Sequence, residues 1–379
     1  VSNAITDDDE LVIRGNEKVL RARLSDAMFF WKSDLQAEFS PEKLKQISYM
    51  QALGSVYDKQ VRELAVARAL SADYATQIEV EIGKKDFAQD IENAVMFSKA
   101  DLSSTMVGEF SELQGIMGSY YAAHAGLAEH VCCAIREQYL PSGEDSELPS
   151  GVFSSVIAVA MKFETLLGLF SIDKVPSGNK DPYALRRAAT GLIKILLNQG
   201  LSFDANALAQ KLVPNYKKFD ISKLLDFIKD RLYGIFDKIN PSVIKACIAS
   251  GENDLLRLSK AIKALGEITA AADFGENFAT FKRLANIIKD EKIGAVDENL
   301  FEHDAERALN AAFRAIKLNE NDVSGYLRSL FGLKGVIDDF FDNVMINAQD
   351  VKIRANRIAN IGQIYRAFLQ FADIKEIGF

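Results

Sequence analysis

Residues 181–200 read DPYALRRAATGLIKILLNQG and contain the signals of a complete helix, including both ends. Asp181 can accept a hydrogen bond from a free N–H of the first turn, and Pro182 has no N–H to leave unsatisfied. The spacing therefore predicts a helix that begins at Pro182 and ends at Gly200. One face of it is apolar and formed by Leu185, Ala188, Leu192 and Ile195.

The same helical spacing of apolar residues extends in both directions along the chain. Residues 41–140 are predicted to be helical almost throughout, and a further helix is expected over residues 152–170. Proline is scarce, with 7 in 379 residues, which leaves long stretches free to form helices. Residues 201–379 also show helical spacing. We therefore predict an all-α protein.

The length of the chain and the positions of its turn residues divide it into three parts. A chain of 379 residues exceeds one ordinary hydrophobic core. Residues 1–40 are interpreted as a lead-in with a short strand at Leu11-Val12-Ile13 and a helix over residues 17–33. We expect a helical domain over residues 41–200, and a helical body with a terminal domain over residues 201–379.

Composition excludes several classes of protein. The three cysteines have neither disulfide nor zinc spacing, which favours a reduced, cytoplasmic protein. No uninterrupted apolar run approaches a membrane span, so no membrane partner is expected. The formal net charge of −8 argues against nonspecific coating of nucleic acids. It still permits a local basic face, because lysines and arginines gather between Lys174 and Lys194.

Few residues offer catalytic chemistry. The sequence contains no glycine-rich phosphate loop and no nucleophile elbow. Only three histidines are present, and His124 and His130 lie six residues apart, a spacing that does not place both on one helical face. We therefore predict no catalytic residue in this chain.

Several motifs in order resemble one known family. They are GNEKVLRARLSDA at residues 15–27, KADL at 99–102, LQGIMG at 113–118, PSGNKDPYALRRAA at 176–189, FFDNVM at 340–345 and RANRI at 354–358. Together they resemble the β subunit of bacterial two-subunit glycyl-tRNA synthetase. The chain also lacks an initiator Met, and we interpret it as a piece of a larger protein of that family.

The resemblance implies an HD-like fold for the middle region. A working HD centre needs histidine and aspartate ligands for divalent metals. Here the candidate pair is His124-Ala125, and Met161 stands where the family often has a metal-binding Asp. The metal site is therefore expected to be degenerate, with no bound metal.

The C-terminal helices resemble the anticodon-binding domain shared with arginyl-tRNA synthetase. In the helix expected from Asp350 to Phe371, polar residues at helical spacing form one face, turned away from a stripe of isoleucines. We interpret this face as binding tRNA, with Asn356 reading a base edge; an ordinary solvated face is the alternative. Arg354 and Arg357 fall on the apolar side, so each needs a buried partner or a bound ligand. The candidate tRNA-binding residues of this helix are Lys352, Arg354, Asn356, Arg357, Asn360, Gln363 and Arg366.

Lys180, Arg186 and Arg187 complete the set of candidate tRNA-binding residues. Guanidinium groups bind phosphate in a bidentate manner, although paired arginines at a helix start more often form salt bridges. Phe29, Phe30 and Trp31 could stack on bases, but packing in a core or subunit interface is the more frequent use of such rings.

The resemblance implies a tRNA-binding subunit of glycine–tRNA ligase. By that analogy, ATP-dependent activation of glycine takes place on a separate α subunit, the complete enzyme is a heterotetramer, and this chain holds no cofactor of its own. A metal-dependent HD-type nucleotide phosphohydrolase and a purely helical scaffold are the alternatives.

Overall fold

A computed structural model describes residues 8–143, 145–178, 180–217, 219–271, 274–288, 291–319 and 322–378. The fold is all-α, as predicted, apart from a hairpin of β1 (Ser48–Met50) and β2 (Gly54–Ser55) that the sequence did not reveal. The chain forms two compact units. Unit 1 comprises residues up to Gln199 together with Leu208–Leu224, and unit 2 comprises Gly200–Ala207 with the residues from Leu225 onward.

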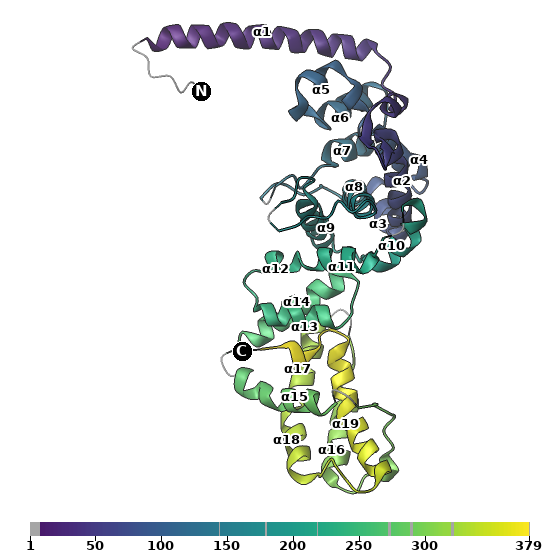
Figure 1. Cartoon of the computed structure of the whole chain (residues 1–379), viewed down its shortest axis with the longest axis vertical. Coiled ribbons are helices and arrows are strands. Elements are labelled where there is room, and N and C mark those ends of the chain that lie inside the picture. The colour runs from purple at the N-terminus through teal and green to yellow at the C-terminus, as the bar shows by residue number, and fades with distance from the viewer. Residues whose placement is uncertain are drawn as a thin grey trace. The chain divides into compact units, whose positions relative to one another are not determined.

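The N-terminal segment is one long helix, α1 (Asp9–Gln36), so the predicted strand at Leu11-Val12-Ile13 is wrong. The Asp8 carboxylate accepts a hydrogen bond from the backbone N–H of Leu11 at 2.9 Å and starts the helix there. The side chains of Leu11, Val12 and Ile13 suit a strand, but a strand needs a neighbour with which to pair. Here these residues lie in the first turns of a helix. Figure 1 shows α1 extending beyond the helices on which its C-terminal end packs.

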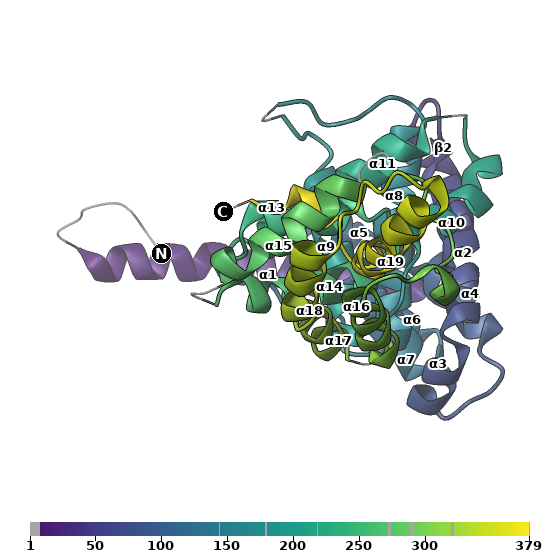
Figure 2. The same cartoon turned by 90° about the horizontal axis from the view of Figure 1, so that it is seen from below.

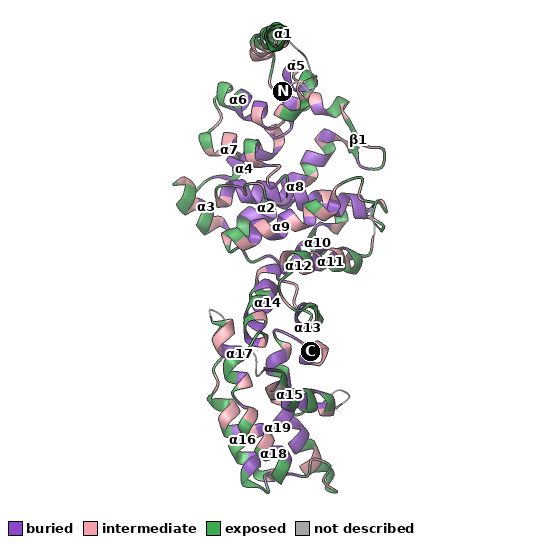
Figure 3. Ribbon diagram, turned by 90° about the vertical axis from the view of Figure 1, so that its left-hand side faces the viewer, coloured by how far each residue is buried: buried purple, intermediate pink, exposed green. Residues whose placement is uncertain are grey.

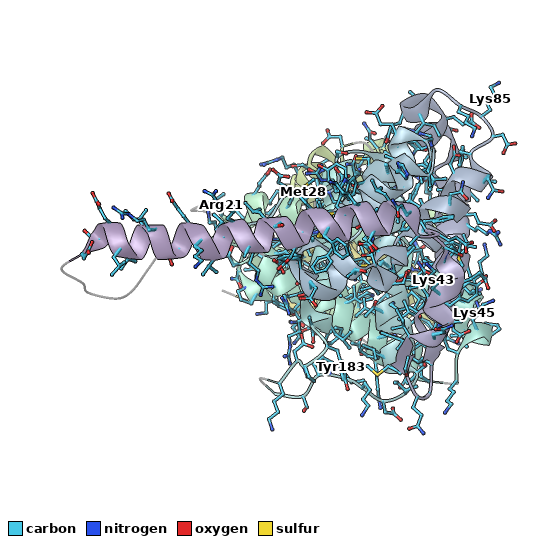
Figure 4. All side chains as sticks on the ribbon, turned by 90° about the horizontal axis from the view of Figure 1, so that it is seen from above. Arg21, Met28, Lys43, Lys45, Lys85 and Tyr183 are labelled. Carbon is cyan, nitrogen blue, oxygen red and sulfur yellow. The ribbon has the colours of Figure 1, made fainter. Side chains whose placement is uncertain are left out.

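Two of the three aromatic rings of α1 pack as expected. Phe30 and Trp31 lie against a cluster that includes Met106 and Tyr121, and the rings of Trp31 and Tyr121 stack with centroids 5.5 Å apart. Phe29, in contrast, is 69% exposed. The outer part of the helix also carries the exposed side chains of Arg21 and Met28 (Figure 4).

The rest of unit 1 consists of short helices around a central one. Its elements are η1 (Pro41–Gln46), α2 (Val56–Asp73), α3 (Ala75–Ile82), α4 (Ala88–Phe97), η2 (Ala100–Ser103), α5 (Thr105–Glu109), η3 (Ser111–Leu113), α6 (Ile116–His124), α7 (Glu129–Glu137), α8 (Val152–Phe170), α9 (Leu185–Gln199) and η4 (Val213–Asn215). Helices α10 (Ala205–Leu212) and α11 (Ile221–Lys229) contain residues of both units.

Helix α8 is the centre of unit 1 and has the predicted bounds. It contacts α2, α7 and α9, and nearly all of its residues are buried (Figure 3). Its length and apolar composition would also suit a membrane span, but 83% of that window is buried inside the protein, as in the core helix of a globular domain. Gly191 lets α9 approach closely, because a Cβ there would lie 2.9 Å from Cε of Lys162.

Helix α9 begins at Leu185, three residues later than predicted. Ala184 adopts a left-handed conformation with φ of 56°, which separates Pro182 and Tyr183 from the helix. Asp181 nevertheless performs the predicted capping, because its carboxylate accepts hydrogen bonds from the backbone N–H groups of Leu185 and Arg186, both at 2.9 Å.

Unit 2 is a bundle around its last long helix. Its elements are α12 (Leu232–Ile235), α13 (Pro241–Ala249), α14 (Leu255–Thr269), α15 (Phe274–Ile288), η5 (Glu298–Leu300), α16 (Asp304–Ala315), α17 (Val323–Phe331), α18 (Lys334–Asn343), α19 (Val351–Leu369) and η6 (Ile374–Glu376). Helix α19 contacts α15, α16 and α17, and Figure 2 shows it beside α16. It is therefore covered on several sides, and a single apolar stripe cannot be its only buried surface.

The central position of α8 predicts a large loss of stability when its core is opened. Phe163 is fully buried, so Phe163→Ala should lower the free energy of unfolding by about 3–5 kcal/mol. Val80, which is 80% exposed, provides the control, and Val80→Ala should change stability by less than about 0.5 kcal/mol. Urea unfolding followed by circular dichroism measures both, and equal losses would contradict the central role of α8.

Candidate nucleic-acid interface

The polar face predicted on α19 is not exposed. Asn356 is 4% exposed and Asn360 is completely buried, so the prediction that these residues are turned away from the core is wrong. Gln363 is half-buried. Of the four residues assigned to that face, only Lys352, at the first turn, is exposed. The apolar stripe itself is confirmed, because Ile358, Ile361 and Ile364 are buried.

The amides of this face hold α19 against α16 and the segment that leads into it. Asn356 accepts a hydrogen bond from the Asp297 N–H at 2.7 Å and donates one to the Asp297 carbonyl at 2.9 Å. Asn360 donates to the Glu306 carbonyl at 2.9 Å, and Gln363 donates to Asn310 Oδ1 at 3.2 Å. Because Asn356 and Asn360 are also buried, their amides cannot present polar atoms to a base as well.

Both arginines on the apolar side have carboxylate partners, but only Arg357 has the buried partner that the sequence required, because Arg354 and Glu291 are only partly buried. Arg357 is 3% exposed, and its guanidinium donates to Glu306 at 3.1 Å, to Glu302 at 2.7 Å and to the Met345 carbonyl at 2.9 Å. Arg354 pairs with Glu291. Both guanidinium groups therefore bind protein, and no RNA is needed to account for Arg357.

The other candidate cations lie at the surface. Arg366 is exposed, although its Nη2 donates to the Ile293 carbonyl at 2.5 Å. In unit 1, Lys180 and Arg187 are exposed, while the half-buried Arg186 donates to the Gly178 carbonyl at 2.5 Å. Their roles in binding tRNA remain predictions. The ten candidates are divided between the two units: Lys180, Arg186 and Arg187 belong to unit 1, and the seven on α19 belong to unit 2.

Sequence reasoning missed a basic face on α15. Lys282, Arg283 and Asn286 are exposed at helical spacing and line an open hollow of about 500 Å³. The guanidinium of Arg283 lies 4.3 Å from the centre of the Phe341 ring, a cation–π contact that fixes its position. The signal in the sequence is the adjacent pair Lys282 and Arg283, with the amide of Asn286 four residues after the first and three after the second. This signal is shorter than the row of amides on α19.

The expected HD-like centre does not have the side chains for a metal. Within the described parts of the chain, no three His, Cys, Asp or Glu side chains lie close enough together to bind an ion. His124 is exposed at the end of α6. Lys59 and Lys99 are buried beside Met161 instead, and ammonium groups repel a divalent cation. The absence of bound metal remains a prediction.

A buried network of ion pairs occupies this region. Lys59 pairs with Glu164 and with Glu63, the latter at 3.1 Å, and Lys99 pairs with Glu63 at 2.7 Å. Arg62 donates from Nε to Glu164 at 2.8 Å. Burial alone would lower the pKa of Lys59, but Glu164 and Glu63 outweigh burial and raise that pKa above its ordinary value.

Two neighbouring groups have pKa values shifted by burial. Lys162 is almost completely buried, and its Nζ donates to the Tyr139 carbonyl at 3.3 Å. Burial, together with the charge of Lys99, lowers the pKa of Lys162 to about 7. Burial also raises the pKa of Asp101, although that carboxylate accepts hydrogen bonds from the backbone N–H groups of Gly115 and Gly118.

Comparison with known proteins identifies the class and then the family. A family model described as "Glycyl-tRNA synthetase beta subunit" matches residues 1–249. The "Glycine--tRNA ligase beta subunit" of Helicobacter pylori (strain G27) is 39% identical over 388 residues, which cover 100% of this chain and 55% of that protein. The protein of the same name from Geotalea uraniireducens (strain Rf4) is 36% identical over 100% of this chain and 56% of its own length.

A third relative of that name, from Streptococcus suis (strain 05ZYH33), is 39% identical over 92% of this chain and 51% of its own length. These similarities place the chain among subunits of aminoacyl-tRNA synthetases. The chain belongs to the glycyl-tRNA synthetase beta subunit family, which confirms the resemblance seen in the motifs. It spans about half the length of the curated relatives that it matches.

The hydrogen bonds of Asn356 predict that its substitution affects stability rather than binding. Asn356→Ala removes both bonds to the Asp297 backbone and should lower the free energy of unfolding by about 1–2 kcal/mol. Urea unfolding measures this, with the exposed Lys352→Ala as control. Unchanged stability combined with weakened tRNA binding by Asn356→Ala would restore the base-reading assignment.

The buried Lys162 predicts a specific dependence of stability on pH. Its pKa is about 7 in the folded protein, against an ordinary value of 10.5, so the unfolded chain binds the extra proton between these values. The contribution of Lys162 to stability therefore rises as pH increases from about 7 to 10. Lys162→Met should be more stable than the parent at pH 7, and the difference should shrink toward pH 10 in urea titrations. A difference independent of pH would show that Lys162 is not buried with a lowered pKa.

Proposed function

We propose that this chain is the tRNA-binding part of the β subunit of a two-subunit glycine–tRNA ligase. It supports the ATP-dependent attachment of glycine to tRNA-Gly, while glycine and ATP are activated on a separate α subunit. Its partners are tRNA-Gly and that α subunit, in a cytoplasmic heterotetramer that needs no membrane. ATP is a substrate of the complete enzyme, and this chain contributes no cofactor or metal.

The exposed face of α15 is the observation in this structure that best supports RNA binding. Lys282 and Arg283 supply positive charge for phosphates, and Asn286 supplies an amide that can bond a base edge. The stack of Arg283 on Phe341 holds one guanidinium in place at low entropic cost. Because these side chains are exposed, they can bind a ligand without disturbing the core, unlike Asn356 and Asn360.

Family membership separates this proposal from the two alternatives. Relatives that span the chain carry the name of a ligase subunit, and none of these findings supports a phosphohydrolase. The lysines at the HD-like centre also disfavour metal-dependent hydrolysis. A purely structural scaffold would leave the basic face of α15 without a use.

The proposal predicts salt-dependent binding of tRNA-Gly that depends on α15. The chain should retain tRNA-Gly in a filter-binding assay at low salt and release it as salt rises, because bound phosphates displace counterions. Lys282→Ala should weaken binding about three- to tenfold and reduce the slope of log K against log salt by about one. The matched control is Lys238→Ala, another exposed lysine of unit 2, which should leave both quantities unchanged.

Equal losses in Lys282→Ala and Lys238→Ala would show diffuse attraction rather than a site on α15. No retention of tRNA-Gly at any salt concentration would contradict the proposed function for this chain. Arg283→Lys adds a finer comparison, because it keeps the charge but loses the planar stack on Phe341. We expect it to bind more weakly than the parent and to have the same salt slope.

A further inference from the structure

A cavity of about 300 Å³ lies in unit 1, beside the buried ion pairs. It is formed by side chains from the β1–β2 hairpin, from α2 and α8, and from the segments around η2, η3 and α7. The polar part of its wall includes Lys59, Lys99 and Tyr139, and the apolar part includes Val56, Leu102 and Met161. A concave, largely apolar site with a few convergent polar groups is the usual form of a small-molecule site.

The charges around this cavity do not balance. Lys59, Arg62 and Lys99 face two carboxylates, Glu63 and Glu164, so the ion-pair network carries one excess positive charge. Asp101 and Lys162, which lie near this network, are of opposite sign and cancel when both are charged. Burial raises the pKa of Tyr49 and of Tyr139, so both line the cavity as neutral groups. An excess buried charge is costly unless a counterion approaches it.

Some donors near the cavity can take a further acceptor. Among the described residues, Nη2 of Arg62 is buried without a hydrogen-bond partner, as are the acceptor oxygens Glu63 Oε1 and Asp101 Oδ1. The Tyr139 hydroxyl accepts a hydrogen bond from Gln114, which leaves its own proton for an acceptor in the cavity. Lys99 donates to Ser98 and Gln138 only at 3.4 and 3.3 Å, and these weak bonds can be exchanged for a stronger acceptor.

We propose that this cavity binds a small organic phosphate. The phosphate lies against the ammonium groups of Lys59 and Lys99 and accepts the proton of the Tyr139 hydroxyl. Lysine suits this role because it acts as a point charge toward phosphate oxygens. The volume exceeds that of phosphate alone, so the apolar body of the ligand packs against Val56, Leu102 and Met161. This site is separate from the face of α15, and it does not depend on tRNA binding there.

The test uses the whole chain with phenyl phosphate and inorganic phosphate as probes, measured by isothermal titration calorimetry. We expect one phenyl phosphate per chain, bound at least fivefold more tightly than inorganic phosphate, because the ring contacts the apolar wall. Lys99→Met should weaken phenyl phosphate binding at least tenfold. Lys85→Met is the control, because Lys85 projects from the surface of the same unit (Figure 4), and it should bind as the parent does.

Lys99→Met is expected to fold, because it leaves two cations against two carboxylates. Tyr139→Phe is a second, independent variant that preserves packing. It should weaken the binding of phenyl phosphate at least threefold. Equal affinities in the parent, Lys99→Met and Tyr139→Phe would overturn the proposal, as would the absence of saturable binding by the parent. Displacement of phenyl phosphate by tRNA-Gly would identify a terminal nucleotide of RNA as the natural ligand. Continued binding in the presence of tRNA would identify a free metabolite instead.

Discussion

The carboxylate of Glu164 is completely buried in the central helix of unit 1, and a buried charge requires partners. Lys59 and Arg62 provide them from α2, which fixes the register of α2 against α8. Glu63, on the same helix as these cations, then holds Lys99 in place. The same constraint acts in unit 2, where Arg357 of α19 is held by Glu306 of α16. In each unit, buried ion pairs thus join helices that are far apart in sequence.

In unit 1, these pairs occupy the region where the expected HD-like fold would hold its metal ligands. The position that would require an Asp ligand is Met161, and it lines a cavity with two lysines. The charged side chains beside that cavity form ion pairs with one another. The RNA recognition proposed for unit 2 follows a similar division. Buried amides on α19 build the bundle, whereas exposed cations on α15 remain available to a ligand.

Local sequence signals predicted the helices well but not the partners of their polar residues. The bounds of α8 and the cap at Asp181 follow from apolar spacing and capping chemistry, which act over a few residues. The exposure of Asn356 depends on Asp297, 59 residues away, and no local pattern reveals such a contact. The buried state of Arg357 was predictable, because its place beside the isoleucines already demanded a partner. The strand expected at residues 11–13 failed because a strand needs a neighbour that the sequence did not supply.

The central claim is that polar residues on α19 are structural and that RNA contacts the surface on α15. Ultraviolet cross-linking of the chain to tRNA-Gly, followed by mass spectrometry of the adducts, tests this claim directly. The account predicts adducts on peptides that contain Lys282, Arg283 or the neighbouring Phe341, and none at Asn356 or Asn360. Adducts concentrated at Asn356 and Asn360, with none on α15, would contradict it.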